Sequence, residues 1–538
     1  MKNSIKLFII GIIVFTSLLT VSLPRNVLAK PKSLSSTGNF TVNTKKPKKL
    51  YVIEDYKMTK GEQTMIATLQ GILSTKSSEQ IYILIDTQPD YMVWLKDLKK
   101  NYSVDYEVVN DPWALLWRFK SYVNGYVLYS YYNPPSINNA CSLASLKNSI
   151  VVESALEDRV KSSGITTKNG DCSNTDYKWA FENLWNSGLN HSTVLEVDPH
   201  KPMSLRDYAI SSKSLVYYEE NANDTSLRDA IFSSMEPNSH CLGWGPDEHG
   251  NVIAASRYGV DVVAADWTYN LSALSSFPLS PMKQSNQPNI KGEDGFHYVT
   301  VIMSDGDNQQ WMLGSNFDSK NYYASRYKGK FNMGWSTNPS IFYLAPTVFK
   351  MYYQNASSGK YSDNFVVAPS GNGYIFPSSY PKNELEGYTK MLSDFMGQSD
   401  LHNVLILDNE SLDNTSLWDK YTKQPNIDGL LYLNYYIHNK YKGKIVWSNN
   451  KPIVSCRHNL WWGLESESTI EDDINKAVAS GHTKLNDPDS YSFIYVHAWS
   501  NTMDNINHLV SKLQSNPRVK VVTPDNFMNI IKTNLAPK

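Results

Sequence analysis

The 538-residue sequence predicts an α/β protein made of an N-terminal α/β domain of divergent repeats and a C-terminal seven-stranded (β/α) barrel. Two observations lead to this prediction. Short runs of β-branched and aromatic residues alternate with helical patterns along most of the chain, which is typical of sheets covered by helices. From residue 296 onward the strand patterns are nearly continuous apolar runs, which indicates a parallel sheet buried on both faces.

The N-terminal domain is expected to cover residues 50–271. Its predicted strands are 50–56, 81–87, 125–132, 149–154, 192–197, 214–220, 241–245 and 260–266. Amphipathic stretches such as 112–123 and 176–188 lie between them and predict helices. An aromatic helix followed by an apolar strand recurs, which indicates divergent repeats, although no fixed period is present.

The C-terminal domain is expected to cover residues 296–538, after a linker at 272–295 that is rich in Ser, Pro, Asn and Gln. Its predicted strands are 296–304, 330–336, 364–370, 403–409, 429–436, 451–459 and 492–500. Helical patterns such as 346–357 and 468–481 separate most of them. Seven such units predict a (β/α) barrel that is one unit short of the usual eight. We expect the two domains to meet at a cleft.

The first residues have the pattern of a signal peptide. Lys2 and Lys6 precede the apolar run 7–23, and small residues before Ala29 predict cleavage near Ala29/Lys30. An uncleaved N-terminal anchor is the alternative. No later segment is apolar and long enough to be predicted to span a membrane. The sequence therefore predicts a secreted, extracellular protein.

Charge and cysteine usage exclude several partners and sites. The net charge is −1, whereas a nucleic-acid-binding domain should be basic, so no nucleic-acid partner is expected. Residues 30–49 are locally basic and predict a solvated linker, with contact to an anionic cell surface as the alternative. The cysteines, at 141, 172, 241 and 456, have no C-x-x-C spacing, so neither a zinc nor a redox site is expected. Export permits a Cys141–Cys172 disulfide, and free buried thiols are the alternative. No cofactor or metal is predicted.

Polar or aromatic residues follow every strand of the predicted barrel. These are Asp305 and Asp307 after the first strand, Trp335 and Ser336 after the second, Ser370 and Asn372 after the third, Asp408, Asn409 and Glu410 after the fourth, Asn434 and Tyr435 after the fifth, Arg457 and His458 after the sixth, and His497 and Trp499 after the seventh. In a barrel the carboxyl ends of the strands meet at one face, where active sites of this architecture lie.

Asp305 and Asp307 lie one residue apart at the end of the most strand-like segment, 299–303. Two carboxylates so close repel, so ionising both costs energy unless a metal, a proton or an activated water accounts for them. The sequence S-D-G-D at 304–307 resembles the D-A-G-D of inverting cellulases, where two aspartates hold the nucleophilic water. Such a pair raises the proton affinity of one member, which suits a general base. Alternatively, D-G-D forms a turn or part of a calcium site. Gly306 is expected to let the chain turn sharply.

Residues 370–377, S-G-N-G-Y-I-F-P, resemble the signature of the GxGYxYP family, whose members are proposed to be glycoside hydrolases. Gly371, Gly373, Tyr374 and Pro377 match the signature, and Phe376 replaces its second tyrosine. The resemblance extends from about residue 50 to the end. It implies an N-terminal domain of divergent repeats, a seven-stranded β/α barrel and a site in the cleft between them.

The resemblance also implies three catalytic carboxylates, which by position and context fall on Glu248, Asp305 and Asp307. Glu248 belongs to the loop G-W-G-P-D-E-H-G at 243–250, where partial desolvation could keep it protonated. Its alternative role is that of a first-turn helix residue favoured by the helix dipole. These roles predict inverting hydrolysis of a poly- or oligosaccharide, with the aspartate pair activating water and Glu248 protonating the leaving oxygen.

Further residues are candidates for binding the sugar, because aromatic rings stack on sugar faces and polar groups bind hydroxyls. They are Trp244, Asn308, Trp311, Trp335, Tyr374, Asp408, Glu410, His497 and Trp499. Core packing is the alternative for each tryptophan, and a helix cap is the alternative for Asp408 and Glu410.

Two other functions stay open at this point. The carboxylates at strand ends, with His458 and His497, could serve a metal-dependent polysaccharide deacetylase or phosphoesterase. Against this, no histidine forms H-x-x-x-H or H-E-x-x-H. A non-catalytic glycan-binding protein would use the same cleft.

Overall fold

A computed structural model describes residue 40 and residues 42–219, 225–285 and 287–537 of the chain. The predicted signal peptide, residues 1–29, and half of the basic segment 30–49 lie outside these residues. The described residues belong to one compact unit. Within them, no helix is long and apolar enough to cross a membrane.

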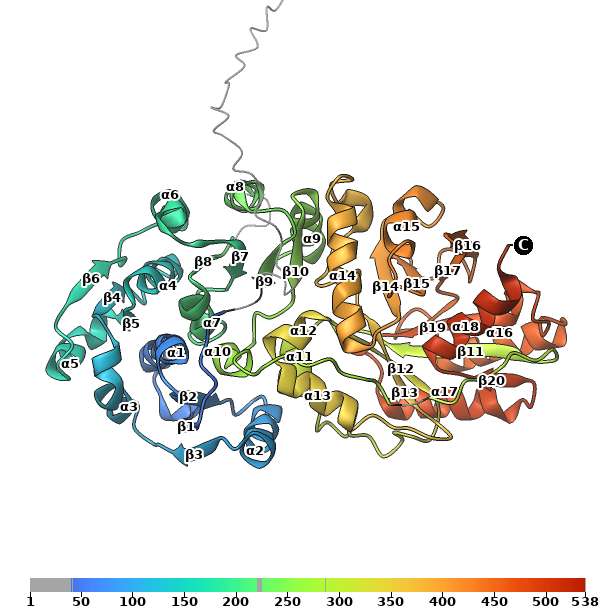
Figure 1. The fold of residues 1–538 in the computed structure, drawn as a ribbon, viewed down its shortest axis with the longest axis horizontal. Coiled ribbons are helices and arrows are strands. Elements are labelled where there is room, and N and C mark those ends of the chain that lie inside the picture. Colours follow the sequence, from blue (N-terminus) through green and yellow to red (C-terminus); the bar gives the residue numbers. More distant parts are fainter. Residues whose placement is uncertain (1–39, 41, 220–224, 286, 538) are drawn as a thin grey trace, which may run out of the picture. The chain divides into compact units, whose positions relative to one another are not determined.

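Three small parallel sheets form the chain from Lys49 to Val263 (Figure 1). The first contains β1 (Lys49–Glu54), β2 (Glu79–Leu84) and β3 (Asp105–Val108); the second contains β4 (Tyr126–Tyr129), β5 (Ile150–Glu153) and β6 (Lys168–Asp171); the third contains β7 (Asn190–Glu196), β8 (Ser214–Tyr217), β9 (Ser239–Gly243) and β10 (Val260–Val263). In every sheet the first strand lies between the second and the third. This shared order is what divergent repeats would produce, although a repeat relationship stays a prediction.

Helices connect these strands. They are α1 (Lys60–Lys76), α2 (Asp90–Tyr102), α3 (Pro112–Phe119), α4 (Pro135–Lys147), α5 (Glu157–Ser162), α6 (Trp179–Leu184), α7 (Arg206–Ser212), α8 (Ser226–Ser234), α9 (Glu248–Arg257) and α10 (Leu271–Leu274). Helix α1 begins where Thr59 and Glu62 form a capping box. All eight strands predicted in this region are present. Strands β3 and β6 were not predicted, because D-Y-E-V and K-N-G-D contain few apolar residues and no residue of either is buried.

One sheet of ten strands forms the C-terminal half. Its strands are β11 (His297–Met303), β12 (Met333–Thr337), β13 (Asp363–Val367), β14 (Asn403–Asp408), β15 (Gly429–Asn434), β16 (Ile445–Ser448), β17 (Lys451–Ser455), β18 (His458–Leu460), β19 (Tyr491–Val496) and β20 (Val519–Val521). They follow the order β16-β17-β15-β14-β13-β12-β11-β19-β18, and β20 also pairs with β11. All pairings are parallel except that of β16 with β17.

The predicted sixth strand, 451–459, is divided into β17 and β18. Strand β17 pairs with β15, whereas β18 pairs with β19, so neighbouring pieces of chain lie near opposite ends of the sheet. Between them, the Cys456 N–H donates to the Tyr432 carbonyl at 2.8 Å and the Arg457 N–H donates to the Phe493 carbonyl at 2.9 Å. The structure is therefore a curled ten-stranded sheet, and a regular seven-stranded barrel stays a prediction.

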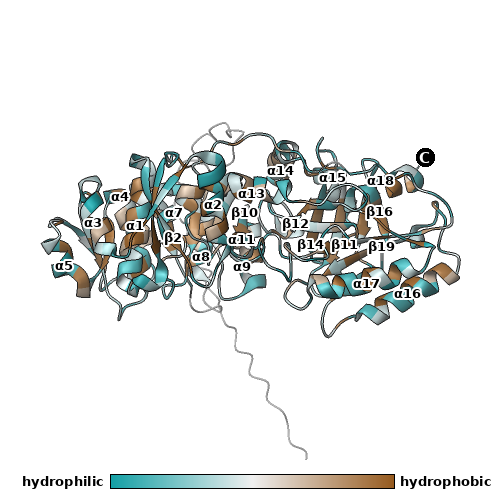
Figure 2. Cartoon of the chain, turned by 90° about the horizontal axis from the view of Figure 1, so that it is seen from below, coloured by the Kyte–Doolittle hydropathy of each residue, from teal (hydrophilic) through white to brown (hydrophobic). Residues whose placement is uncertain are grey.

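Helices cover the curled sheet. They are α11 (Gln309–Gly314), α12 (Ser340–Leu344), α13 (Pro346–Gln354), α14 (Leu385–Ser399), α15 (Thr415–Thr422), α16 (Glu467–Ala479), α17 (Met503–Ser515) and α18 (Pro524–Leu535). Every residue of β11, β14 and β15 is buried. Figure 2 shows hydrophobic strands in this half, while α16 and α17 mix hydrophobic and hydrophilic residues. The apolar runs that predicted a doubly covered sheet therefore lie in its core.

In the described part of the predicted linker, which excludes residue 286, no strand is present and the helical residues are the last of α10. Within it, the Gln284 side chain accepts from the Phe365 N–H at 2.7 Å and donates to the Asp400 carbonyl at 2.6 Å. These bonds attach the segment to the C-terminal half, and a domain boundary at 272–295 stays a prediction. The four cysteines are buried free thiols, so a Cys141–Cys172 disulfide is not present.

Candidate active site

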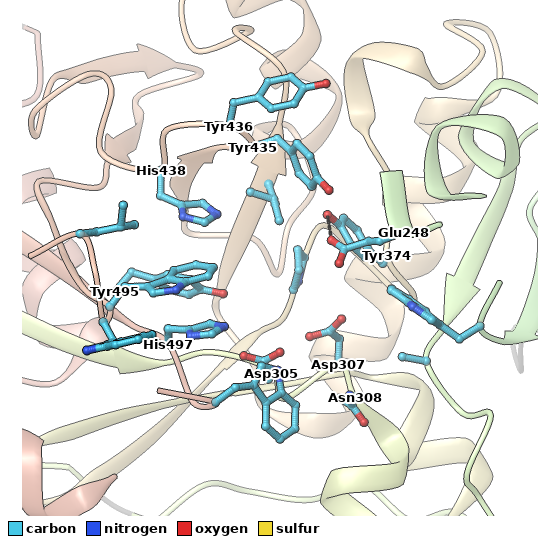
Figure 3. Close-up of a pocket in the computed structure, with 18 of the residues that line it drawn as sticks. Glu248, Asp305, Asp307, Asn308, Tyr374, Tyr435, Tyr436, His438, Tyr495 and His497 are labelled. Carbon is cyan, nitrogen blue, oxygen red and sulfur yellow. Dashed lines mark hydrogen bonds between the residues drawn. The ribbon is translucent and has the colours of Figure 1, made fainter. Parts of the chain in front are cut away.

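A pocket of about 780 Å³ lies at the carboxyl ends of the strands of the curled sheet, and elements that follow β9 and β10 form one of its walls (Figure 3). Carboxylates and aromatic rings dominate its lining. The carboxylates are Glu248, Asp266, Asp305 and Asp307; the rings are Trp244, Tyr374, Tyr435, Tyr436, His438, Trp461, Trp462, Tyr495, His497 and Trp499; Asn308 and Gln310 add amides. The three carboxylates proposed from the sequence as catalytic thus share one pocket.

The aspartate pair is held by a tight turn after β11. Asp305 has a φ of 64°, a left-handed conformation that a residue with a side chain adopts at a cost. A Cβ atom on Gly306 would lie 1.7 Å from the Ser336 carbonyl oxygen. The role expected for Gly306 is therefore corrected: Asp305 takes the unusual backbone angle, and Gly306 permits close packing on β12.

The electrostatics of the pair indicate that Asp307 holds a proton at neutral pH. Burial, and then the charges of Asp305 and Glu248, raise the pKa of Asp307 to about 8. Burial also raises the pKa of Asp305, while hydrogen bonds from Ser304 and Trp499 act against that rise. Because each charge disfavours ionisation of the other, Asp307 is the member that retains the proton.

Glu248 enters the pocket from the first turn of α9 (Figure 3). Asp247 caps this helix by accepting from the Gly250 N–H at 2.8 Å. Glu248 as a whole is exposed to solvent, but its carboxyl group is partly desolvated in the pocket. This desolvation raises the pKa of Glu248, and the charges of Asp305 and Asp247 add to the rise. The Tyr374 hydroxyl donates to the Glu248 carboxylate at 3.2 Å, which lowers its pKa in part.

The motif at 370–377 connects the two sides of the pocket. Tyr374 exchanges backbone hydrogen bonds of 2.7 and 3.1 Å with Val262 on β10. The Phe376 N–H donates to the Ser256 hydroxyl on α9 at 2.9 Å. A Cβ atom on Gly373 would lie 2.8 Å from the carboxyl of Asp261, so this glycine allows the close approach. The motif therefore fixes β10 and α9, and with them Glu248, against the C-terminal sheet.

A stack of three rings forms the wall opposite Glu248 (Figure 3). The Trp461 ring is 3.5 Å from the His497 ring at an interplanar angle of 4°, and 5.0 Å from the His438 ring at 21°. Burial lowers the pKa of His438 and of His497 to about 4, so both are neutral at pH 7. The sequence analysis identified His497 but not His438 or Trp461. The W-W-G at 461–463 could have pointed to Trp461.

Five of the predicted sugar-binding residues line the pocket, namely Trp244, Asn308, Tyr374, His497 and Trp499. Trp311 and Trp335 lie outside the lining and are buried. The Trp311 ring packs edge-on against Trp499 at 5.3 Å. The Trp335 indole N–H donates to the Asp363 carboxylate at 3.0 Å. These two tryptophans take the core-packing alternative.

Asp408 and Glu410 also lie outside the lining of the pocket. Asp408 is buried and accepts from the Ser378 N–H at 3.1 Å, from the Ser378 hydroxyl at 2.7 Å and from the Ser411 hydroxyl. Glu410 points to solvent and pairs with Lys440. Helix α15 begins at Thr415, too far along the chain for either residue to be its N-cap. The expectation that they face the cleft is therefore corrected, because their oxygens are used within the fold.

The residues that a metal-dependent hydrolase would require do not gather. Among the described residues, neither the aspartate pair, Asp408, Glu410 nor His497 belongs to a group of three potential ligands within 4.8 Å of one another. His458 does belong to one, with Glu465 and Asp473, but none of these three lines the pocket. Glu248, Asp305 and Asp307 do not form such a group either, since their oxygens do not all lie within 4.8 Å of one another.

Four family models match the chain. The model described as "GxGYxYP putative glycoside hydrolase C-terminal domain" matches residues 295–532, and the models of the first, second and third N-terminal domains match 49–121, 123–189 and 191–276. No match was found among curated proteins.

Two solved structures are similar to the chain. One, described as a "putative hydrolase" from Bacteroides thetaiotaomicron VPI-5482, is 32% identical with a TM-score of 0.84, and the match covers 93% of this chain and 98% of that chain. The other, a 4-alpha-glucanotransferase from Thermococcus litoralis, is 10% identical over 46% of this chain and 40% of that chain, and its TM-score of 0.26 is too low to indicate a common fold. The four models and the first structure together show that the chain belongs to the GxGYxYP family.

Proposed function

We propose that the chain is a secreted glycoside hydrolase that cleaves a poly- or oligosaccharide with inversion at the anomeric carbon. One observation carries the proposal: an aspartate pair shares an aromatic-lined pocket with a glutamate from a different part of the chain. The family description and the similar structure support a hydrolase in general.

In the proposed reaction the aspartate pair acts on the water and Glu248 acts on the leaving group. Asp305, the ionised member of the pair, accepts a proton from a water as that water attacks the anomeric carbon. Asp307 keeps its own proton and holds the water by a hydrogen bond. Glu248 gives a proton to the leaving oxygen as the glycosidic bond breaks. The entry of the proposed base and the proposed acid from separate parts of the chain supports inversion, because a water must fit between base and sugar.

One alternative for the acid follows from the pKa of Asp307, which is about 8. A group that is protonated at neutral pH is suited to donate to a leaving oxygen. Substrates with very acidic leaving groups need no such donor. If Glu248→Gln retains activity on aryl glycosides while Asp307→Asn does not, Glu248 is the acid; the reverse result assigns the acid to Asp307.

The test is incubation of the purified protein with a panel of polysaccharides and glycosides, followed by mass spectrometry and by NMR of the first product. We expect hydrolysis, an inverted anomer and severe loss in Asp305→Asn. A retained anomer would overturn the inverting mechanism. Glycan affinity without turnover would identify a binding protein, and turnover abolished by a chelator would identify a metal-dependent enzyme.

A further inference from the structure

A second pocket, of about 540 Å³, adjoins the first. Trp462, Gly463 and Leu464 line both pockets, so a single short loop separates them. The rest of its lining consists largely of hydroxyl and amide side chains, among them Ser466, Ser468, Thr469, Ser500, Asn501 and Asn505. Groups of this kind bind sugar hydroxyls, and they continue the proposed site beyond the carboxylates.

The loop between the pockets is anchored at its base. Glu465 forms β-bridges with Leu460 and Trp461, and its carboxylate accepts from the Asn439 amide at 3.0 Å. The side chains that the loop presents are nevertheless exposed, Trp462 to 85% and Leu464 to 62%. A fixed backbone that holds an indole in solvent between two pockets provides a flat apolar face on which a sugar ring can stack.

The charges of the two pockets select the kind of glycan. Four carboxylates and neither lysine nor arginine are found among the described residues that line the first pocket. Asp266 is paired with Lys201, which itself is not in the lining, and the two histidines in the lining are neutral. A uronate or sulfate on the sugar would therefore meet like charge and no partner.

The second pocket adds no excess of cations. Its Glu467 pairs with His508, and its Lys512 pairs with Glu471 at 3.1 Å. Neither pocket is therefore suited to an anionic sugar.

From these observations we infer that the substrate is an uncharged glycan chain of several units, which runs from the carboxylate pocket across Trp462 into the second pocket. This inference rests on the proposed function, since it takes the first pocket as the place of cleavage.

The first test measures kcat/KM on linear uncharged oligosaccharides of increasing length, drawn from the cello-, xylo-, manno-, malto- and laminari- series. We expect kcat/KM of the unmodified protein to rise with chain length, and Trp462→Ala to reduce the values for the longest chains by about 3- to 10-fold, the worth of one aromatic stacking contact. Trp117→Ala is the matched control, because Trp117 is 66% exposed and lies on α3, outside both pockets.

A second variant separates the pockets. Ser468 lines only the second pocket and is exposed, so Ser468→Arg should obstruct that pocket without disturbing the fold. It should also reduce the gain in kcat/KM with length. If both variants follow the unmodified protein at every length while hydrolysis is intact, the extended site is overturned and the proposed function stands.

The choice of an uncharged glycan is tested by affinity electrophoresis of Asp305→Asn against the uncharged polysaccharides and against polygalacturonate, alginate and heparin. Retardation by the uncharged polymers alone supports the inference. Preference for an anionic polymer overturns it without affecting the hydrolase proposal. Absence of binding and turnover across all of these glycans overturns both.

Discussion

Two strands of the curled sheet lead into similar acidic sequences, but the carboxyl groups of the two sequences have different surroundings. Asp305-Gly-Asp307 follows shortly after β11, and Asp408-Asn-Glu410 begins at the last residue of β14. Each includes a non-glycine residue at positive φ, 64° for Asp305 and 50° for Glu410. After β11 both carboxyls line the pocket, whereas after β14 one is buried among serine donors and the other pairs with a lysine.

The difference lies in which groups occupy the carboxyl oxygens. Asp408 accepts hydrogen bonds from Ser378 and Ser411, which offset part of the rise in its pKa that burial causes. Asp307 gains little such support, and burial and neighbouring charge raise its pKa to about 8. Carboxyls that the fold leaves uncompensated are the ones available for substrate.

The largest effect on activity is expected from replacing Asp307. Asp307→Asn should lower kcat by roughly 10²-fold, because the attacking water loses the group that holds it in position, and should leave glycan affinity largely intact. Steady-state kinetics together with a binding measurement check this. The matched control is Asp408→Asn; equal losses in the two variants would remove the distinction between the strand ends.

Removing the compensated group should affect stability instead. Asp408→Ala leaves donors on Ser378 and Ser411 without their acceptor, and a buried unpaired polar group costs about 1–3 kcal/mol. We expect a loss of that order in the free energy of unfolding, measured by denaturant titration. An unchanged stability would mean that water replaces the carboxylate at no cost.

The two strand ends should also differ in the pH dependence of stability. Folded Asp307 keeps its proton up to a pKa of about 8, whereas the unfolded chain releases it near 3.8. Between these values the folded state binds more protons, so this carboxyl lowers stability as pH rises. Asp307→Asn lacks the effect, and its stability relative to the unmodified protein should increase by about 1 kcal/mol from pH 4 to pH 8, allowing for solvent screening. Denaturant titrations over this range measure it, and a constant difference would contradict the raised pKa.

The smallest effect is expected at Glu410, whose ion pair with Lys440 is exposed. Glu410→Gln should change the free energy of unfolding by no more than about 0.5 kcal/mol and leave kcat and glycan affinity unchanged. Kinetics on the best substrate of the panel would show this. A clear loss of affinity would instead place Glu410 in contact with the glycan.

The two acidic strand ends also show which parts of the fold and site the sequence could predict. Apolar runs and turn signals were sufficient to locate all the predicted strands, and the D-G-D and the 370–377 motif led to the pocket. Alternating and helical patterns of apolar residues do not show which strands pair with each other. The sequence therefore could not predict that one part of 451–459 pairs with β15 and the other part with β19.

The part of the site that was missed lies mostly on irregular segments. His438 and Trp461 follow β15 and β18 in loops whose paths depend on tertiary packing. The same packing separated the two acidic strand ends. Sequence could identify both as candidates, but only the positions of Ser378, Ser411 and Lys440 show that one set of oxygens is already occupied.

The split strand has a consequence for assembly of the chain. Strand β17 pairs with β15 and strand β18 pairs with β19, so one short stretch of chain covers the edges of two strands. An open edge of a parallel sheet is a template for aggregation. Displacement of this one stretch would therefore expose both edges at once and convert a self-contained fold into one prone to polymerise.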